Sequence, residues 1–208
     1  MVIRPEEEQD YRAVENLTRE AFWNVHAPGC DEHLLVHTLR KAKEFVKALD
    51  FVAVCENRIV GNIVYAESKI VDGQKEHTVL TFGPLSVLPE YQNRGIGRRL
   101  IEHTVKLARE MGYKAILIYG YPGYYRRFGF TESKIFGITN KDGKYPAALL
   151  ALELYQGALS GIHGIFDEGD SYRVDEQELA EFDKGFPEKE KLTTPSQERF
   201  LEMVKQFL

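Results

Sequence analysis

An apolar run that ends at a proline, and is followed by two glycines and a helical pattern, constrains the fold of this chain more than any other segment. Residues 85–88 read Leu-Ser-Val-Leu, Pro89 follows, and Gly95 and Gly97 precede the apolar periodicity of residues 97–111. This order predicts a strand, a short loop and a helix start. Backbone N–H groups at a helix start lack carbonyl partners, and the helix dipole adds positive charge there. Because glycine leaves the main chain uncovered, the loop suits a phosphate or pyrophosphate.

Three phosphate-binding patterns can be compared with this loop. The chain contains no run of glycine, four residues and Gly-Lys-Ser/Thr, which a Walker loop requires. A dinucleotide fingerprint needs a third glycine three residues after the second, and Leu100 occupies that position. The third pattern, Gln/Arg-x-x-Gly-x-Gly/Ala, is satisfied by residues 92–97, which read Gln-Asn-Arg-Gly-Ile-Gly.

Two downstream segments extend this pattern. Residues 114–119, Lys-Ala-Ile-Leu-Ile-Tyr, are typical of a buried strand, and residues 122–130 read Pro-Gly-Tyr-Tyr-Arg-Arg-Phe-Gly-Phe. The ordered set of strand, loop, helix, strand and Tyr-Tyr-x-x-x-Gly-Phe resembles the GCN5-related N-acetyltransferases (GNAT), most of all the predicted bacterial acetyltransferases of the YhbS type. In that superfamily the loop binds the pyrophosphate of coenzyme A. The resemblance covers roughly residues 1–155 and is strongest over residues 80–130.

The resemblance implies an α/β (α+β) fold: a GNAT-like mixed, central, splayed β-sheet flanked by helices on both faces. Pro84 cannot donate a ladder hydrogen bond, so strand pairing should fail there on one side. From the residues we expect these elements: a strand at 2–3, helices at 6–22 and 31–41 (the second with Asp31 as N-cap), hairpins turning at 56–57 and 72–73, helices at 97–111 and 122–128, strands at 114–119 and 146–155, and a C-terminal helix beginning at Thr194-Pro195.

The composition changes along the chain. Charged residues crowd 167–191, and apolar residues recur at helical spacing beyond Thr194, at Phe200, Met203, Val204, Phe207 and Leu208. We therefore expect an N-acetyltransferase domain over residues 1–165. Residues 166–208 would form a charged extension that ends in an amphipathic helix, docked on the same domain or seeking a partner.

Charge and length exclude some classes of protein. The 208 residues carry a formal net charge of −5, which argues against a nucleic-acid partner because such proteins favour a basic face. No apolar run approaches the roughly 20 residues that span a bilayer, so no membrane partner is expected. The acidic N-terminus is unlike a targeting segment, and the two cysteines, Cys30 and Cys55, make no disulfide framework. These features predict a cytoplasmic protein and leave a homodimer open.

The resemblance also implies the chemistry and the residues that carry it. Acetyl-CoA would donate an acetyl group directly to the amine of a small molecule or the amino group of a protein. Tyr125, four residues before Gly129, would protonate the leaving sulfur. The cofactor-binding residues would be Leu85, Ser86 and Val87 of the strand and Gln92, Asn93, Arg94, Gly95, Ile96, Gly97 and Arg98 of the loop and helix start. No metal is expected, because His26, Cys30, His33 and His37 lack a Cys-x-x-Cys pair.

Two questions stay open at the level of the sequence. The general base is unassigned; the candidates are Glu32, His33, Glu67 and His77, or a water molecule held by backbone carbonyls. A second function also fits the loop, namely a non-catalytic acyl-CoA-binding sensor or protein-interaction module. That function would need the loop at 92–98 but no acid at Tyr125.

Overall fold

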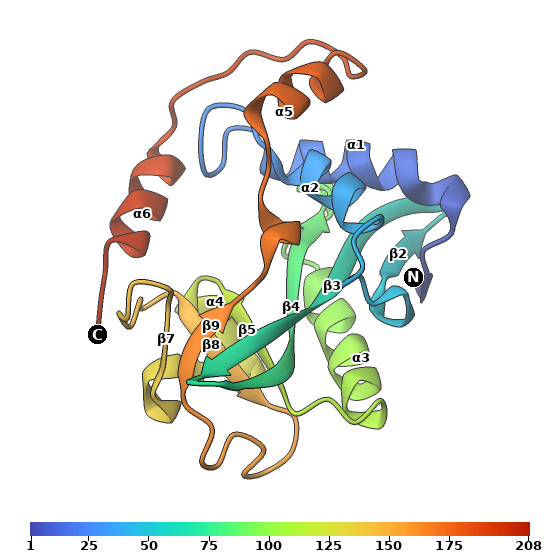
Figure 1. The fold of residues 1–208 in the computed structure, drawn as a ribbon. Coiled ribbons are helices and arrows are strands. Elements are labelled where there is room, and N and C mark those ends of the chain that lie inside the picture. The colour runs from blue at the N-terminus through green and yellow to red at the C-terminus, as the bar shows by residue number, and fades with distance from the viewer.

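Two long strands, β3 (Arg58–Asp72) and β4 (Lys75–Val87), form the centre of the fold in the computed structural model, which describes residues 1–208 (Figure 1). They pair antiparallel along almost their whole lengths. The path through the sheet is β1-β2-β3-β4-β5-β8-β6, and β9 pairs with both β3 and β7. The other strands are β1 (Val2–Pro5), β2 (Phe51–Cys55), β5 (Ala115–Tyr119), β6 (Thr131–Glu132), β7 (Ile138–Thr139), β8 (Leu149–Glu153) and β9 (Gly164–Asp167).

Helices cover both faces of this sheet, as the resemblance implied. Alternate residues of β3 face opposite sides: Ile63 and Tyr65 pack with α3 (Ile96–Glu110), whereas Val64 and Ala66 pack with α1 (Tyr11–Phe22) and α2 (Glu32–Leu39). The two-residue period of a strand, with apolar side chains on both faces, therefore places β3 in the middle layer. The short helix α4 (Pro122–Tyr125) and the 3-10 turn η4 (Arg126–Phe128) follow β5.

Most of the expected elements form within a few residues of the predicted bounds. Both hairpins are present, and residues 149–153 are a strand, as expected, because they pair with β5. The first helix begins later than predicted, at Tyr11, after a 3-10 turn at Glu8–Asp10. Asp31 stands at the N-cap of α2, but its side chain makes no capping hydrogen bond.

The two central parallel strands separate early, which confirms the splay. β4 and β5 pair only at Leu80 and Ile116. Beyond that point the register between β3 and β4 shifts, so that Gly83 and Pro84 together lie opposite one residue of β3. The bulge bends β4 away from β5 and leaves one edge of β4 unpaired.

The sequence did not predict β6, β7 or β9. β9 joins the sheet at the end of β3, where Ile70 pairs with Phe166. Residues 164–167 therefore cross the predicted boundary at 165/166, and the division into domains stays a prediction. Because β9 gains its pairing from residues nearly 100 positions away, no local pattern marked it.

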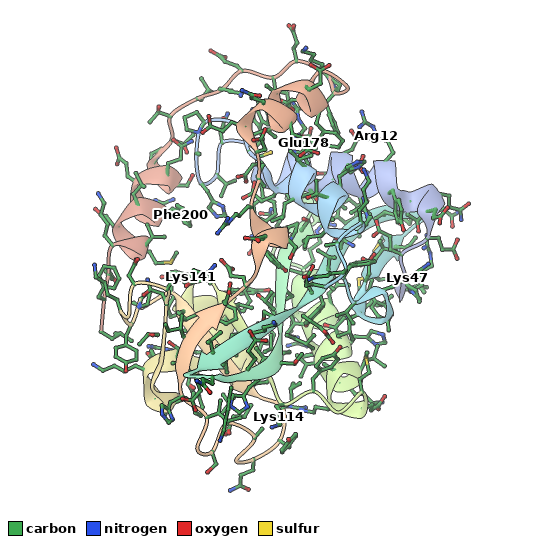
Figure 2. The ribbon with its side chains drawn as sticks, in the orientation of Figure 1. Arg12, Lys47, Lys114, Lys141, Glu178 and Phe200 are labelled. Carbon is green, nitrogen blue, oxygen red and sulfur yellow. The ribbon has the colours of Figure 1, made fainter.

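The rest of the C-terminal segment consists of η6 (Asp170–Tyr172), α5 (Glu176–Asp183) and α6 (Pro195–Val204). Arg19 of α1 contacts Asp183 at 2.8 Å. Phe200 lies on α6 (Figure 2), and its ring stacks on His26 with centroids 4.4 Å apart. Thr194 and Gln197 form the capping box that begins α6. Leu201, Val204, Phe207 and Leu208 remain exposed. The longest helix, α3, has 15 residues, and none of the helices combines the length and apolar character needed to cross a bilayer.

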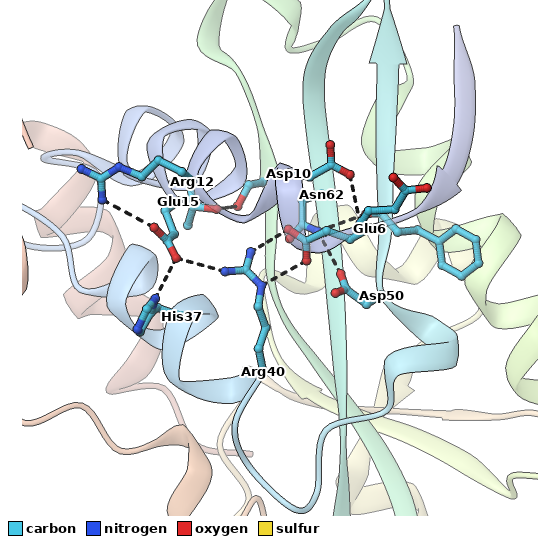
Figure 3. Close-up of polar contacts among 12 residues, drawn as sticks. Glu6, Asp10, Arg12, Glu15, His37, Arg40, Asp50 and Asn62 are labelled. Atoms are coloured by element: carbon cyan, nitrogen blue, oxygen red, sulfur yellow. Dashed lines mark hydrogen bonds and ion pairs between the residues drawn. The ribbon is translucent and has the colours of Figure 1, made fainter.

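A buried ionic network ties the N-terminus to α2 and β2 (Figure 3). Arg40 contacts Glu6 at 2.6 Å and Glu15 at 3.1 Å, and the fully buried Asn62 donates to Asp50 at 3.2 Å. Burial, together with the hydrogen bond to Glu6 and the charge of Glu6, raises the pKa of Asp50 to about 9. Asp50 is therefore protonated at neutral pH in the folded protein.

Replacement of Asp50 by asparagine should flatten the pH dependence of stability. In the unfolded chain an aspartate loses its proton near pH 3.9, whereas folded Asp50 keeps it to about pH 9. The folded state thus binds one more proton between these values, so the free energy of unfolding falls as pH rises, by on the order of 1 kcal/mol per pH unit. Urea unfolding at pH 5, 7 and 8.5 should show a smaller decline for Asp50→Asn than for the wild type. The exposed Asp170→Asn is the control, and equal declines in all three proteins would contradict the assignment.

Candidate functional site

Six consecutive backbone N–H groups, those of residues 93–98, donate no hydrogen bond within the protein. They span the link between the 3-10 turn at Pro89–Tyr91 and the first turn of α3. Asn93 (φ +58) and Gly95 (φ +78) adopt left-handed backbone conformations. Alternation of left- and right-handed residues points successive N–H groups into one concavity, and the helix dipole adds to its positive potential. The arrangement is suited to an anion, as the sequence predicted.

This loop lines a cavity of about 530 Å³ that lies between α1, the end of β4 and α4. The cavity brings together most of the residues that the sequence singled out: Leu85, Val87, Gln92, Asn93, Gly95, Ile96, Gly97, Arg98 and Tyr125. Two predicted residues lie elsewhere. The Ser86 side chain is buried on the opposite face of β4 and hydrogen-bonds Thr18 at 2.9 Å. Arg94 packs over the ring of Tyr91 and lines a neighbouring cavity, although its backbone N–H belongs to the free set.

Aromatic packing fixes the ring of Tyr125. The ring contacts those of Tyr124, Phe130 and Phe82, with centroid distances of 5.0, 5.7 and 5.8 Å. A Cβ atom at Gly120 would overlap the Tyr125 ring, so the absence of a side chain at Gly120 makes room for it. Burial raises the pKa of Tyr125, which keeps the phenol protonated throughout the neutral range.

The cavity also contains residues that the sequence did not indicate as ligand contacts. Ala21, Phe22 and Val25 close it from the end of α1, and Arg127 lies over the ring of Tyr124, with its guanidinium carbon 4.9 Å from the centroid. No local pattern tells which strand the end of α1 will meet. For Arg127 the sequence did offer a signal, because the adjacent arginines at 126 and 127 directly follow the paired tyrosines at 124 and 125. Arg98 and Arg127 add positive charge beside the free N–H groups.

None of the four candidate bases lines this cavity. Glu32 bonds His26 at 3.0 Å, and Glu67 accepts a hydrogen bond from Tyr113 at 2.7 Å. His33 is fully buried between Cys30 and Asp183, where burial lowers its pKa. The Nε2 atom of His77 is buried without a partner near the start of β4, at the far end of that strand from the loop. These side chains therefore have structural partners or lie away from the loop.

Comparison with known proteins finds one family model and several similar proteins. The model of the acetyltransferase (GNAT) domain matches residues 46–132. An uncharacterized N-acetyltransferase of Escherichia coli (strain K12), YhbS, is 28% identical over 169 residues, which are 80% of this chain and 95% of that protein. A second one, YjhQ, also from that strain, is 32% identical over 96 residues, which are 46% of this chain and 53% of YjhQ, so the match spans about half of that relative.

Solved structures agree with this result. The crystal structure of YhbS from Escherichia coli in complex with CoA superposes with a TM-score of 0.73 at 23% identity, over 84% of this chain and 93% of that one. A GNAT family acetyltransferase from Brucella melitensis in complex with acetyl-CoA gives a TM-score of 0.66 at 28% identity, over 83% and 97%. Residues 46–132 thus match the acetyltransferase (GNAT) domain, and the mixed sheet flanked by helices is the fold of GNAT acetyltransferases.

Substitution of Gly120 by alanine should destabilise the protein, because the new methyl group would displace the Tyr125 ring from a packed cluster. Overpacking of this kind lowers the free energy of unfolding by about 1–3 kcal/mol. Urea unfolding of Gly120→Ala, Tyr125→Ala and the double variant forms a cycle that isolates the contact. The alanine at 120 should be nearly neutral once the Tyr125 ring is gone. An equal loss of stability in both backgrounds would show that the ring does not occupy this space.

Proposed function

We propose that this protein is an acetyl-CoA-dependent N-acetyltransferase that moves an acetyl group directly to a primary amine. One observation carries the proposal: a single cavity is lined by five of the six residues with free N–H groups, by the unpaired edge of β4 and by Tyr125. An anion site, an extended polar edge and a proton donor are what a pyrophosphate-linked thioester needs. The relatives in complex with CoA and acetyl-CoA support the same cosubstrate.

The cavity suggests how the cosubstrate binds. Its pyrophosphate would accept hydrogen bonds from the backbone of residues 93–98, with Arg98 and Arg127 as charged partners. Its amide-containing arm would lie along β4, where Leu85 and Val87 have backbone groups on the edge that β5 leaves free. The predicted contact of Arg94 is then that of its backbone N–H, since its side chain lines a neighbouring cavity. Ser86 would make no contact of its own, because its backbone faces Asn62 of β3 and its side chain bonds Thr18.

Tyr125 would act as the general acid. The amine nitrogen attacks the thioester carbonyl carbon, the carbon–sulfur bond breaks with its electron pair on sulfur, and the phenol gives that sulfur a proton. The raised pKa of Tyr125 suits this role, because the proton is still present when the thiolate forms. The acceptor would be a small-molecule amine or a protein amino group.

A second function also has an observation in its favour. The exposed residues Leu201, Val204, Phe207 and Leu208 would suit a partner surface, so the protein could be a non-catalytic acyl-CoA-binding sensor or interaction module. The two functions differ in one requirement. A sensor needs the loop but no proton donor at Tyr125.

Substitution of Gly95 by aspartate should abolish acetyl-CoA binding, because it places a carboxylate beside the N–H groups that would hold the pyrophosphate. Gly112→Asp is a matched control: Gly112 has φ +83, close to the +78 of Gly95, and a Cβ meets no atom within 4 Å at either position. Calorimetric titration should give micromolar binding for the wild type and for Gly112→Asp. A similar affinity for Gly95→Asp would mean that the loop does not hold the pyrophosphate.

Replacement of Tyr125 by phenylalanine separates the two functions. We expect acetyl-CoA affinity to stay within about twofold and the transfer rate to fall by about 100-fold or more, the usual contribution of a general acid. The release of free CoA thiol in the presence of an amine measures the rate. Tyr121→Phe, a change on a largely exposed tyrosine that does not line the cavity, is the control. Unchanged turnover of Tyr125→Phe would rule out the assigned role.

A further inference from the structure

A second cavity, of about 180 Å³, opens at the end of β5 on the face of the sheet opposite to α3. Its walls come from β5, from the loop after β7 that carries Lys141 (Figure 2), and from the segment that joins β9 to η6. The aromatic and charged residues of the lining are Tyr119, Lys141, Phe166, Glu168, Tyr172 and Arg173. Three of them are aromatic, and Glu168 is the only acid in the lining.

The two cavities lie on opposite sides of the place where β4 and β5 separate. On β4, Phe82 contacts the Tyr125 ring, while the next residue, Gly83, faces Tyr172: a Cβ there would lie 4.0 Å from the Tyr172 ring. On β5, Tyr119 lines the second cavity, and its neighbour Gly120 abuts the ring of Tyr125. A thioester that reaches the opening from the first cavity therefore faces the second cavity.

Two polar groups of the second cavity are poorly paired within the protein. The Tyr172 hydroxyl is buried near the side chain of Thr81 but forms no hydrogen bond of good geometry. Glu168 forms no ion pair, because the neighbouring cations are engaged elsewhere: Lys141 holds Asp167 at 2.8 Å, and Arg173 holds Asp170 at 3.1 Å. Buried polar groups are almost always paired, but the Tyr172 hydroxyl lacks a good partner, and the half-buried Glu168 carboxylate in the same cavity is free to bind a ligand beside it.

We propose that the second cavity binds the acceptor amine as its ammonium ion, and that Glu168 is the base that removes its proton. The inference rests on the proposed function and assigns the substrate class and the base within it. The cavity is lined by the Glu168 carboxylate and by the aromatic rings of Tyr119, Phe166 and Tyr172, a combination that attracts a compact cation. An ammonium group donates hydrogen bonds that Glu168 and the Tyr172 hydroxyl can accept. The small volume selects a small primary amine.

The environment of Glu168 suits proton removal. Burial raises the pKa of its carboxyl group, the positive charge of Lys141 opposes that rise, and the charge of Asp167 adds to it. A carboxylate of raised pKa is a stronger base than an exposed one and takes a proton more readily from an ammonium ion.

The protons balance in the following way. The ammonium ion gives one proton to Glu168, which passes it to solvent. The free amine then forms the bond to the acetyl carbon, the carbon–sulfur bond breaks, and Tyr125 protonates the sulfur. The second proton lost by nitrogen restores the Tyr125 phenol through solvent. The products are the amide, free CoA and one released proton.

The test uses the full-length protein, acetyl-CoA and a panel of five amines: ethylamine, ethanolamine, putrescine, benzylamine and tyramine. Calorimetry measures acetyl-CoA binding, and released CoA thiol measures transfer. Glu168→Gln keeps the size of the side chain but removes the base. We expect kcat/KM for an accepted amine to fall by about 100-fold or more, with the Kd of acetyl-CoA unchanged. Glu178→Gln is the control, because it is the same substitution at an exposed residue of α5 that does not line the cavity.

Tyr172→Phe provides a second variant, which removes only one hydroxyl group. It should raise KM for the amine by about three- to tenfold, the usual effect of one lost hydrogen bond, and leave the Kd of acetyl-CoA unchanged. A kcat/KM of Glu168→Gln equal to that of the wild type would overturn the inference. A wild-type protein that binds acetyl-CoA but acetylates no amine of the panel would overturn it as well. A wild type that does not bind acetyl-CoA would instead overturn the proposed function itself.

Discussion

The early separation of β4 from β5 is the constraint on which the rest of the candidate site depends. The strands share one paired position, Leu80 with Ile116, and the bulge at Gly83–Pro84 then turns β4 away. In a regular sheet, the backbone donors and acceptors of an inner strand are all hydrogen-bonded to the two neighbouring strands. Here an inner strand keeps a free edge, and this edge is bounded by the open N–H groups of the loop on one side and by Tyr125 on the other. The opening thus provides polar backbone, positive potential and a proton donor in one place.

Tight packing of side chains fixes the positions of the elements on either side of the gap between β4 and β5. Tyr125 lies in an aromatic cluster with Phe82 and Phe130, and Gly120 leaves the ring no spare room. α3 fixes the position of the loop, because Leu100 and Ile101 are fully buried in the same core as Ile63 and Tyr65. Packed strands and helices therefore set the distances between the groups that line the cavity.

The C-terminal segment is part of this arrangement rather than a loose tail. β9 adds to the sheet beside Ile70, and η6 brings Tyr172 against β4. Further along, Arg19 and His33 both contact Asp183. The family model matches residues 46–132, so Glu168 and Tyr172 lie outside the part of the chain that family patterns describe. The inferred acceptor site is therefore completed by residues that lie outside the matched domain.

The sequence by itself determined the central motif, because each of its signals is local. Pro84, Pro89, Gly95 and Gly97 impose backbone conformations, and the periodicity of residues 97–111 fixes a helix after them, so strand, loop, helix and the position of Tyr125 followed directly. Only the tertiary structure decided the remainder. β9, the partners of the Ser86 and Arg94 side chains, and the meeting of Glu168 and Tyr172 with Tyr119 all depend on contacts between segments distant in the chain. Such contacts are stabilised by the burial of apolar surface between whole helices and strands, and a short stretch of sequence cannot predict which elements will pack together.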